Sequence, residues 1–324
     1  MNNKSEAIVD IRDGLSVTDR KILSVLIDML LPNTYFCRSS KVTHEIEERY
    51  AIDPYDSYEI IIDLAREEHQ LNLVDGHGNF SYFPAAPDYS ECRCSEFLRS
   101  LVGNGAFSPD VSIPVDMPLP FLLIAGTPGY CSIDSKIPVH DKASVMSAVF
   151  SLIRNPEISN EELMQIIKGP VLYVGGTIIN TDELPEIYER GHGEIRFAIS
   201  RKTLNPECSW RSIKDICAEY CNWYGHKLTK PEGPKKGYYE ITIQYNAFLT
   251  NGTETRYFSL KEILQEFIKQ YTNRIKKRNG CAPNTDMLCQ LLASEAQTLD
   301  EVMASKNDSE LNALFSFLAS RGKL

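Results

Sequence analysis

The chain has 324 residues, of which 43% are hydrophobic and 24% are charged. This composition is typical of a globular protein with two or three domains. No apolar run is long enough to cross a bilayer, and the N-terminus MNNKSEAIVD lacks the apolar core of a signal peptide. The sequence therefore predicts a cytoplasmic protein without a membrane partner. A formal net charge of −10 argues against strong, sequence-independent DNA binding by the whole chain, but it leaves room for a local basic face.

Nine cysteines are present. Without an export signal they are predicted to be free thiols. Cys92 and Cys94, and also Cys217 and Cys221, are close in sequence, but no CxxC pair with a matching histidine pair accompanies them. We therefore expect no metal site in this chain.

The first third of the chain is predicted to contain helices followed by a small hairpin. Apolar residues recur at helical spacing over residues 16–31, 40–50 and 57–68. The dipeptide Asp75-Gly76 then predicts a tight turn, and a further helix is expected from Ser90 to Leu101. This order is typical of a winged helix, a helix-turn-helix variant that binds DNA. The pattern alone favours a small α+β domain without a DNA role.

The remaining chain mixes helices and strands. Residues 103–120 are rich in Gly, Pro and Ser and are predicted to form a linker or loop. The basic segment Lys227–Gly237 is predicted to be a solvated loop. The other expected elements are helices at 142–154, 159–168, 213–223, 260–275 and 286–302, a strand within 193–202, and a hairpin at 238–258 that turns at Asn251-Gly252.

Tyr89 stands at the end of the turn-rich segment, in the sequence YSECR. A tyrosine can act as a nucleophile, but with a pKa of about 10 the phenol is almost wholly protonated at neutral pH. It therefore needs a base, cations or a metal nearby. The chain has 16 tyrosines, so a packing role is the alternative for any one of them.

Seven segments in order along the chain resemble the A subunit of bacterial type IIA DNA topoisomerases, that is, gyrase and topoisomerase IV. In that family the segment LVDGQGNFG precedes a Tyr-Thr-Glu-X-Arg segment, and here LVDGHGNF precedes YSECR. The other segments are AIVDIRDGLSVTDRKIL, SSKVTHEIEERY, YEIIIDLA, KIPVHDKASVMSAV, PEIYERGHGEIRF and SLKEILQEFIKQ.

The resemblance implies an α+β fold with a winged-helix breakage-reunion domain at 1–104, a shortened tower-like domain at 105–257, and a helical tail at 258–324 as the remnant of a coiled-coil arm. It implies that Tyr89 attacks a phosphodiester of double-stranded DNA, forming a 5′-phosphotyrosine and a free 3′-hydroxyl. Mg²⁺ and ATP are expected on the partner B subunit, which carries the ATPase, rather than on this chain. A homodimer of this chain is a further expected partnership. The cations implied to face DNA are Arg12, Arg20, Lys21, Lys41 and Arg93.

Tyr130 follows Gly129 at the position where the family inserts an apolar residue between base pairs to bend DNA. An aromatic side chain is able to act as such a wedge. The alternative is that Tyr130 is a half-buried loop residue.

Several family residues around the tyrosine are replaced. Asp88 and Glu6 stand where the family has arginine, Ser16 and Asp19 replace a lysine and a histidine, and IDPYD replaces HPHGD. Neutral or acidic groups oppose phosphoryl chemistry, which needs positive charge near the reacting phosphate. Two hypotheses therefore stand: an active breakage-reunion protein that works with an ATPase/Mg²⁺ partner, and an inactive module that binds DNA or another topoisomerase component and modulates it. A protein-only interaction domain is a third.

Overall fold

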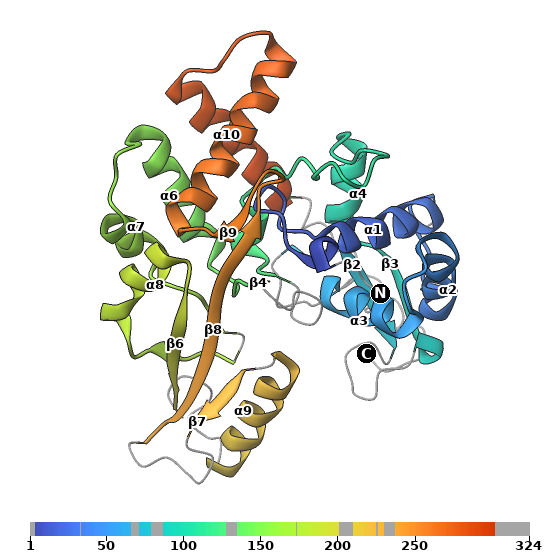
Figure 1. Ribbon diagram of the computed structural model, residues 1–324, viewed down its shortest axis with the longest axis horizontal. Coiled ribbons are helices and arrows are strands. Elements are labelled where there is room, and N and C mark those ends of the chain that lie inside the picture. Colours follow the sequence, from blue (N-terminus) through green and yellow to red (C-terminus); the bar gives the residue numbers. More distant parts are fainter. Residues whose placement is uncertain are drawn as a thin grey trace, which may run out of the picture.

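The computed structural model of the chain describes residues 4–32, 34–65, 71–78, 87–127, 135–172, 174–200, 210–224, 226–229 and 237–301. Figure 1 shows two lobes side by side, one built by the first hundred residues and the other by the rest of the described chain. Both lobes contain helices and strands, in agreement with the α+β class that the sequence predicts. Within the described ranges no helix is long and apolar enough to cross a membrane.

The first lobe packs four helices around a small sheet. Ser16 caps the first helix in a capping box with Asp19, which fixes the helix start. The third helix begins at Pro54, earlier than predicted, because proline suits the first helical position and Asp53 accepts from the Tyr55 amide at 2.8 Å. The helices are α1 (Val17–Leu30), α2 (Ser39–Tyr50), α3 (Pro54–Leu64) and α4 (Glu96–Gly103), with short 3-10 turns η1 (Lys4–Ala7) and η2 (Pro87–Tyr89).

The sheet of this lobe corrects one prediction. The expected helix from Ser90 is instead strand β3 (Ser90–Cys94), and α4 begins only at Glu96 with Ser95 as its cap. The residues of β3 alternate between the core and the outer face, so their period is two rather than 3.6. β3 lies between β1 (Cys37–Arg38) and β2 (Val74–Gly78), antiparallel to both.

The turn predicted at Asp75-Gly76 is not found; the dipeptide lies inside β2. Asp75 is opposite Arg93 and Gly76 is opposite Cys92. The connection from β2 to η2 runs through residues 79–86, outside the described part of the chain. Pairing along five residues of β3 outweighs the local turn propensity of Asp-Gly.

The second lobe is organised around one long strand. The twelve-residue β8 (Tyr239–Thr250) runs through the lobe (Figure 1) and pairs with four other strands. The sheet order is β4-β8-β6-β5, with β7 and β9 also on β8. The elements are α5 (Phe121–Ile124), β4 (Ser135–Lys136), α6 (Lys142–Arg154), α7 (Asn160–Ile167), β5 (Thr177–Ile178), η3 (Thr181–Glu183), α8 (Leu184–Arg190), β6 (His192–Ile199), α9 (Trp210–Tyr224), β7 (Lys227–Thr229), β9 (Thr255–Tyr257) and α10 (Leu260–Asn279).

Most predicted elements of this lobe are confirmed. The hairpin turns at Asn251-Gly252, where the Asn251 side chain accepts from the amides of Thr253 and Glu254 at 3.0 Å. One prediction is corrected: Lys227–Thr229 is a strand rather than a loop, because it pairs with β8. The rest of that basic segment, at 230–236, lies outside the described residues.

The described chain ends with α10 and a second helix at 285–301. Ser259 and Glu262 form a capping box at the start of α10, and α10 ends at Gly280, which has φ 75°. Arg274 connects this second helix with the segment that follows α4, donating to Glu295 at 3.0 Å and to the Asp116 carbonyl at 3.2 Å.

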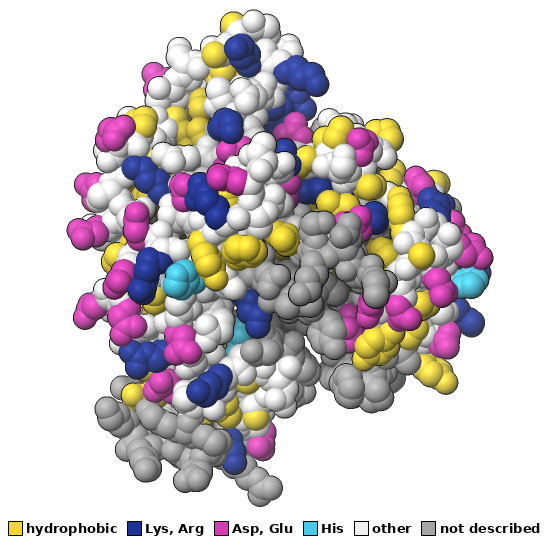
Figure 2. Space-filling model, viewed as in Figure 1, with side chains coloured by type: hydrophobic (Ala, Val, Ile, Leu, Met, Phe, Trp, Pro, Cys, Tyr) yellow, Lys and Arg dark blue, Asp and Glu magenta, His cyan; other side chains and the backbone are white. Residues whose placement is uncertain are grey.

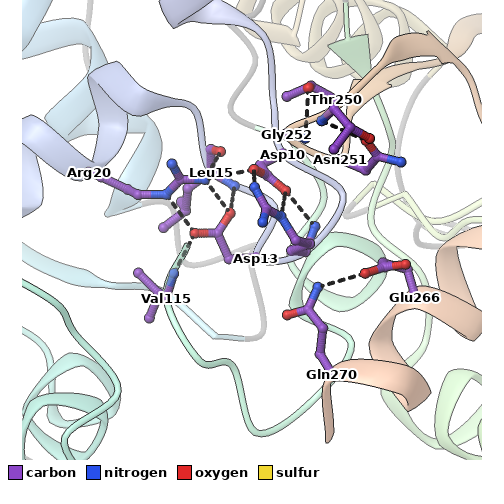
Figure 3. A network of polar contacts seen from close by, with 12 residues as sticks. Asp10, Asp13, Leu15, Arg20, Val115, Thr250, Asn251, Gly252, Glu266 and Gln270 are labelled. Carbon is purple, nitrogen blue, oxygen red and sulfur yellow. Dashed lines mark hydrogen bonds and ion pairs between the residues drawn. The ribbon is translucent and has the colours of Figure 1, made fainter. Parts of the chain in front are cut away.

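A short segment joins the two lobes. The amide of Ile11 donates to the Thr250 carbonyl at 2.8 Å, and the amide of Thr250 donates to the Val9 carbonyl at 3.0 Å. Beside this bridge the Asp10 carboxylate lies between Arg12 and Arg20 (Figure 3). The first lobe is thus tied to the end of β8 by two backbone hydrogen bonds.

Candidate functional site

Tyr89 projects from the surface of the first lobe. Its side chain belongs to the last residue of η2, is 77% exposed, and makes no hydrogen bond to any described residue. Its backbone is closely packed: a Cβ added to Gly78 would lie 2.8 Å from the Tyr89 carbonyl oxygen, and Gly78 has φ +85°. Glycine at position 78 therefore allows β2 to approach the tyrosine. The phenol is exposed while its backbone is held.

A buried cluster of hydroxyls anchors the residue after the tyrosine. The Ser90 hydroxyl lies 2.6 Å from the Tyr58 hydroxyl and donates to Ser39 Oγ at 2.9 Å. Ser39 is the first residue of α2, and Tyr58 lies on α3, so three elements meet here. Burial raises the pKa of Tyr58, which keeps this phenol neutral and able to donate. The cluster holds the start of β3, and hence Tyr89, against the two helices.

The outer face of the sheet carries a row of polar pairs beside Tyr89. Arg93 donates to Asp75 at 3.0 Å and its guanidinium lies 4.5 Å from the centre of the Phe36 ring. In the next row His77 Nδ1 lies 3.4 Å from Glu91 Oε2. Arg93 thus lies on β3, which begins directly after Tyr89, and its charge is paired with a carboxylate of this chain.

Arg12 and Arg20 lie away from this sheet, at the junction of the lobes. Arg12 donates to both oxygens of Asp10, at 2.8 and 2.7 Å. The Arg20 side chain is 3% exposed and donates to both oxygens of Asp13, at 2.7 and 3.0 Å. Both guanidinium groups are therefore part of an internal network (Figure 3). In this conformation Arg20 is not accessible to a DNA backbone.

The two predicted lysines differ. Lys21 Nζ donates to Glu6 at 2.8 Å and lies 5.7 Å from the centre of the Tyr50 ring. Lys41 is exposed and has no ion pair with any described residue. It lines a pocket of about 550 Å³ at the β1 edge of the small sheet. The other lining residues are Met29, Leu30, Tyr35, Phe36, Cys37, Arg38 and Glu91.

Two further predictions are that Tyr130 inserts between DNA base pairs as a wedge and that the chain has no metal site. Tyr130 lies in residues 128–134, outside the described part of the chain. Among the described residues, no three His, Cys, Asp or Glu side chains lie together as metal ligands would. The cysteines found in the described ranges are all free thiols.

Sequence reasoning missed three residues of this surface. Arg38, Glu91 and His77 are opposite one another on β1, β3 and β2. The signal that identifies them is strand register, which becomes visible only once Ser90–Cys94 is assigned to a strand.

Residues 6–216 match the family model that describes the A subunit of DNA gyrase/topoisomerase IV. The chain belongs to this family. The matched range of this gyrase/topoisomerase IV A-family chain includes Tyr89, all five predicted cations and nearly the whole first lobe. The segment SLKEILQEFIKQ lies beyond it, so the resemblance of α10 to the family arm stays a prediction.

Individual relatives agree with this assignment. The chain is 31% identical over 210 residues to the DNA gyrase A subunit of Dehalogenimonas lykanthroporepellens, covering 59% of this chain and 26% of the relative. It is 32% identical over 211 residues to the DNA gyrase A subunit of Synechocystis sp., covering 58% and 24%. It is 29% identical over 209 residues to the DNA topoisomerase 4 A subunit of the same organism, covering 58% and 23%. This A-family chain thus spans about a quarter of the length of these relatives.

Proposed function

We propose that this A-family chain breaks and rejoins DNA through Tyr89, as part of an assembly with a B-type ATPase partner. The observation that carries the proposal is the geometry of Tyr89: a phenol that is 77% exposed, on a backbone held by Gly78 and the Ser90 hydroxyl cluster. A nucleophile must be accessible to its substrate and fixed relative to the groups that bind it. A tyrosine that served only packing would bury its ring.

The fold of the first lobe supports a DNA-facing role. Three helices followed by the antiparallel β2 and β3 are the order of a winged helix. We propose that residues 1–104 are such a domain, that 105–257 are a shortened tower, and that 258–324 correspond to a coiled-coil arm. Tyr89 and Lys41 both lie around the small sheet, so a duplex crossing this surface would meet the nucleophile and an exposed cation together.

Among the described residues, no three His, Cys, Asp or Glu side chains lie together as metal ligands. We propose that Mg²⁺ and ATP belong to the B-type partner, and we derive no step of this chain's chemistry through the metal. The proposed partners are double-stranded DNA, a second copy of the chain and the B-type protein.

One observation favours an alternative, an inactive module that binds DNA or another topoisomerase component. Four of the five predicted cations are already paired with carboxylates of this chain; they are Arg12, Arg20, Lys21 and Arg93. In addition, the exposed Asp88 adjoins Tyr89. On the face shown in Figure 2, Asp and Glu side chains are interspersed with Lys and Arg over both lobes. Little positive charge is then left to hold a DNA backbone.

A cleavage trap tests the proposal. The protein is mixed with supercoiled plasmid and Mg²⁺, with and without the B subunit of a gyrase relative, then denatured with detergent and treated with protease. Linear or nicked DNA is expected from the wild type and is expected to disappear in Tyr89→Phe. Tyr35→Phe is the matched control, because Tyr35 is 80% exposed on the same lobe. Measurable DNA binding without breaks under any condition would support the inactive module instead.

A further inference from the structure

The outer face of the small sheet carries a second group beside Tyr89. Along β3 the side chains of Ser90, Cys92 and Cys94 are buried, whereas Glu91 and Arg93 face outward. The register sets His77 opposite Glu91 and Gly78 opposite Ser90. Tyr89 is the last residue of η2, directly before the first residue of β3, and its backbone carbonyl lies against Gly78, the residue that follows His77.

His77 is held by two contacts and left open on its remaining side. Its Nδ1 lies 3.4 Å from Glu91 Oε2, and its ring centre lies 5.3 Å from that of Phe36. Its side chain is 70% exposed. A carboxylate at Nδ1 favours the tautomer that carries its proton there, which leaves Nε2 as a hydrogen-bond acceptor. The pair of a carboxylate and an imidazole is the arrangement that orients a histidine for proton transfer.

The backbone segments that carry the two residues are adjacent. A Cβ added to Gly78, the neighbour of His77, would lie 2.8 Å from the Tyr89 carbonyl oxygen. The Tyr89 phenol makes no hydrogen bond to a described residue, so it is able to rotate toward His77. The charged residues in register with His77 are Glu91 and Arg38, and Asp88 precedes Tyr89 in η2.

We propose that His77, positioned by Glu91, accepts the phenolic proton of Tyr89 when the tyrosine attacks. This proposal rests on the proposed function of Tyr89. As the bond from the tyrosine oxygen to phosphorus forms and the bond from phosphorus to the 3′-oxygen breaks, the proton moves to His77 Nε2. The released 3′-oxygen takes a proton from water. On rejoining, the imidazolium returns its proton to the tyrosine oxygen, and the 3′-hydroxyl gives its proton back to water. His77 would be a catalytic residue and Glu91 a positioning residue.

The first test measures the nucleophilicity of Tyr89 without DNA. An aryl sulfonyl fluoride reacts with the full-length chain, and labelling at each tyrosine is followed by mass spectrometry. Tyr35, which is 80% exposed, serves as the standard within the same molecule. We expect Tyr89 to react at least about tenfold faster than Tyr35, a modest part of the acceleration that a positioned base provides. His77→Gln should bring Tyr89 close to the Tyr35 rate, and Glu91→Gln should lower it partly, with labelling of Tyr35 unchanged. Equal labelling of Tyr89 in wild type and His77→Gln would overturn the proposal.

The second test uses the cleavage trap. His77→Gln is expected to slow DNA breakage by about 10²-fold, and added imidazole should partly restore breakage in His77→Ala. A purely structural role for His77 would give no such rescue and would count against the proposal. If the wild type breaks no DNA while labelling of Tyr89 still depends on His77, the proposed function fails and the inferred base stands. If the wild type breaks DNA and neither readout depends on His77, the function stands and the base does not.

Discussion

Arg20 and Asp13 form a buried ion pair with two contacts, 2.7 Å from Nε to Oδ2 and 3.0 Å from Nη2 to Oδ1. Asp13 also accepts from the backbone amides of Val115 at 2.8 Å and Leu15 at 3.1 Å. The pair therefore connects α1 with the segment just before it and with the segment that follows α4. A residue that the family resemblance implies to face DNA has here an internal structural role.

Asp13→Asn should destabilise the protein strongly. It removes the carboxylate that accepts two hydrogen bonds from the buried Arg20 guanidinium and leaves only the longer contact to Asp10, at 3.4 Å. Loss of one partner of a buried ion pair typically costs about 3–5 kcal/mol. Urea unfolding followed by circular dichroism measures the difference in the free energy of unfolding. Arg49→Ala is the matched control, because Arg49 makes its ion pairs with Asp28 and Glu45 at the surface, where such pairs contribute about 1 kcal/mol or less. Equal losses in the two variants would contradict a special role for the buried pair.

Gly78→Ala should disturb both stability and the position of Tyr89. The added Cβ would lie 2.8 Å from the Tyr89 carbonyl oxygen, so η2 must move. Gly105 has a similar backbone, with φ +71°, but nothing lies within 4 Å of an added Cβ. We expect Gly105→Ala to cost roughly 1–2 kcal/mol for the left-handed backbone and Gly78→Ala to cost about 1 kcal/mol more for the clash. Thermal unfolding of both variants measures this, and a Gly78→Ala cost no larger than that of Gly105→Ala would refute the close approach.

His140 should make the stability depend on pH. It is buried in the second lobe, with Nε2 2.6 Å from the Tyr188 hydroxyl, and burial lowers its pKa to about 4. In the unfolded chain its pKa is about 6.5, so between about pH 6.5 and 4 the unfolded state binds the proton and the folded state does not. Stability from this residue is complete above about pH 6.5 and falls by on the order of 3 kcal/mol as the pH drops to 4.

The measurement is the free energy of unfolding of wild type and His140→Gln from pH 4 to pH 8. The comparison is needed because Asp19, whose pKa burial raises to about 6, acts in the opposite direction. The folded state takes up a proton at Asp19 before the unfolded state does. Subtracting the variant removes this contribution. A difference between the two proteins that does not vary with pH would show that His140 does not titrate as its burial requires.

Lys41 should account for more DNA binding than Lys21. Lys41 is exposed without an ion pair to any described residue, whereas Lys21 is paired with Glu6. If Lys41 contacts a phosphate, Lys41→Gln will weaken binding and reduce the slope of log K against log salt by about 0.9. Lys21→Gln should change the slope less. Lys168→Gln, an exposed lysine of the second lobe, is the control. A slope unchanged by Lys41→Gln would remove Lys41 from the DNA interface.

Most of the longer helices were predictable because their signals are local, whereas the short α5 and α8 were not predicted. The stripe on α10 and the capping boxes at Ser16, Ser159 and Ser259 each depend on residues within a few turns. The strand Ser90–Cys94 was not predictable in the same way. Its five residues become a strand because β2 pairs with them, and this pairing partner lies across a connection whose path no short pattern encodes.

The sequence by itself determined the family, the order of most of the longer helices and the candidate nucleophile, because motifs and helical periodicity depend only on residues that are close in the sequence. Only the tertiary structure decided which charges remain available. Arg20 and Lys41 are equivalent cations in the sequence, yet one is buried against Asp13 and the other is exposed. The register of β2 on β3 likewise decided that His77 meets Glu91 beside Tyr89. The physical reason is that ion pairing and proton transfer act over a few ångströms, and the fold alone sets which residues come that close.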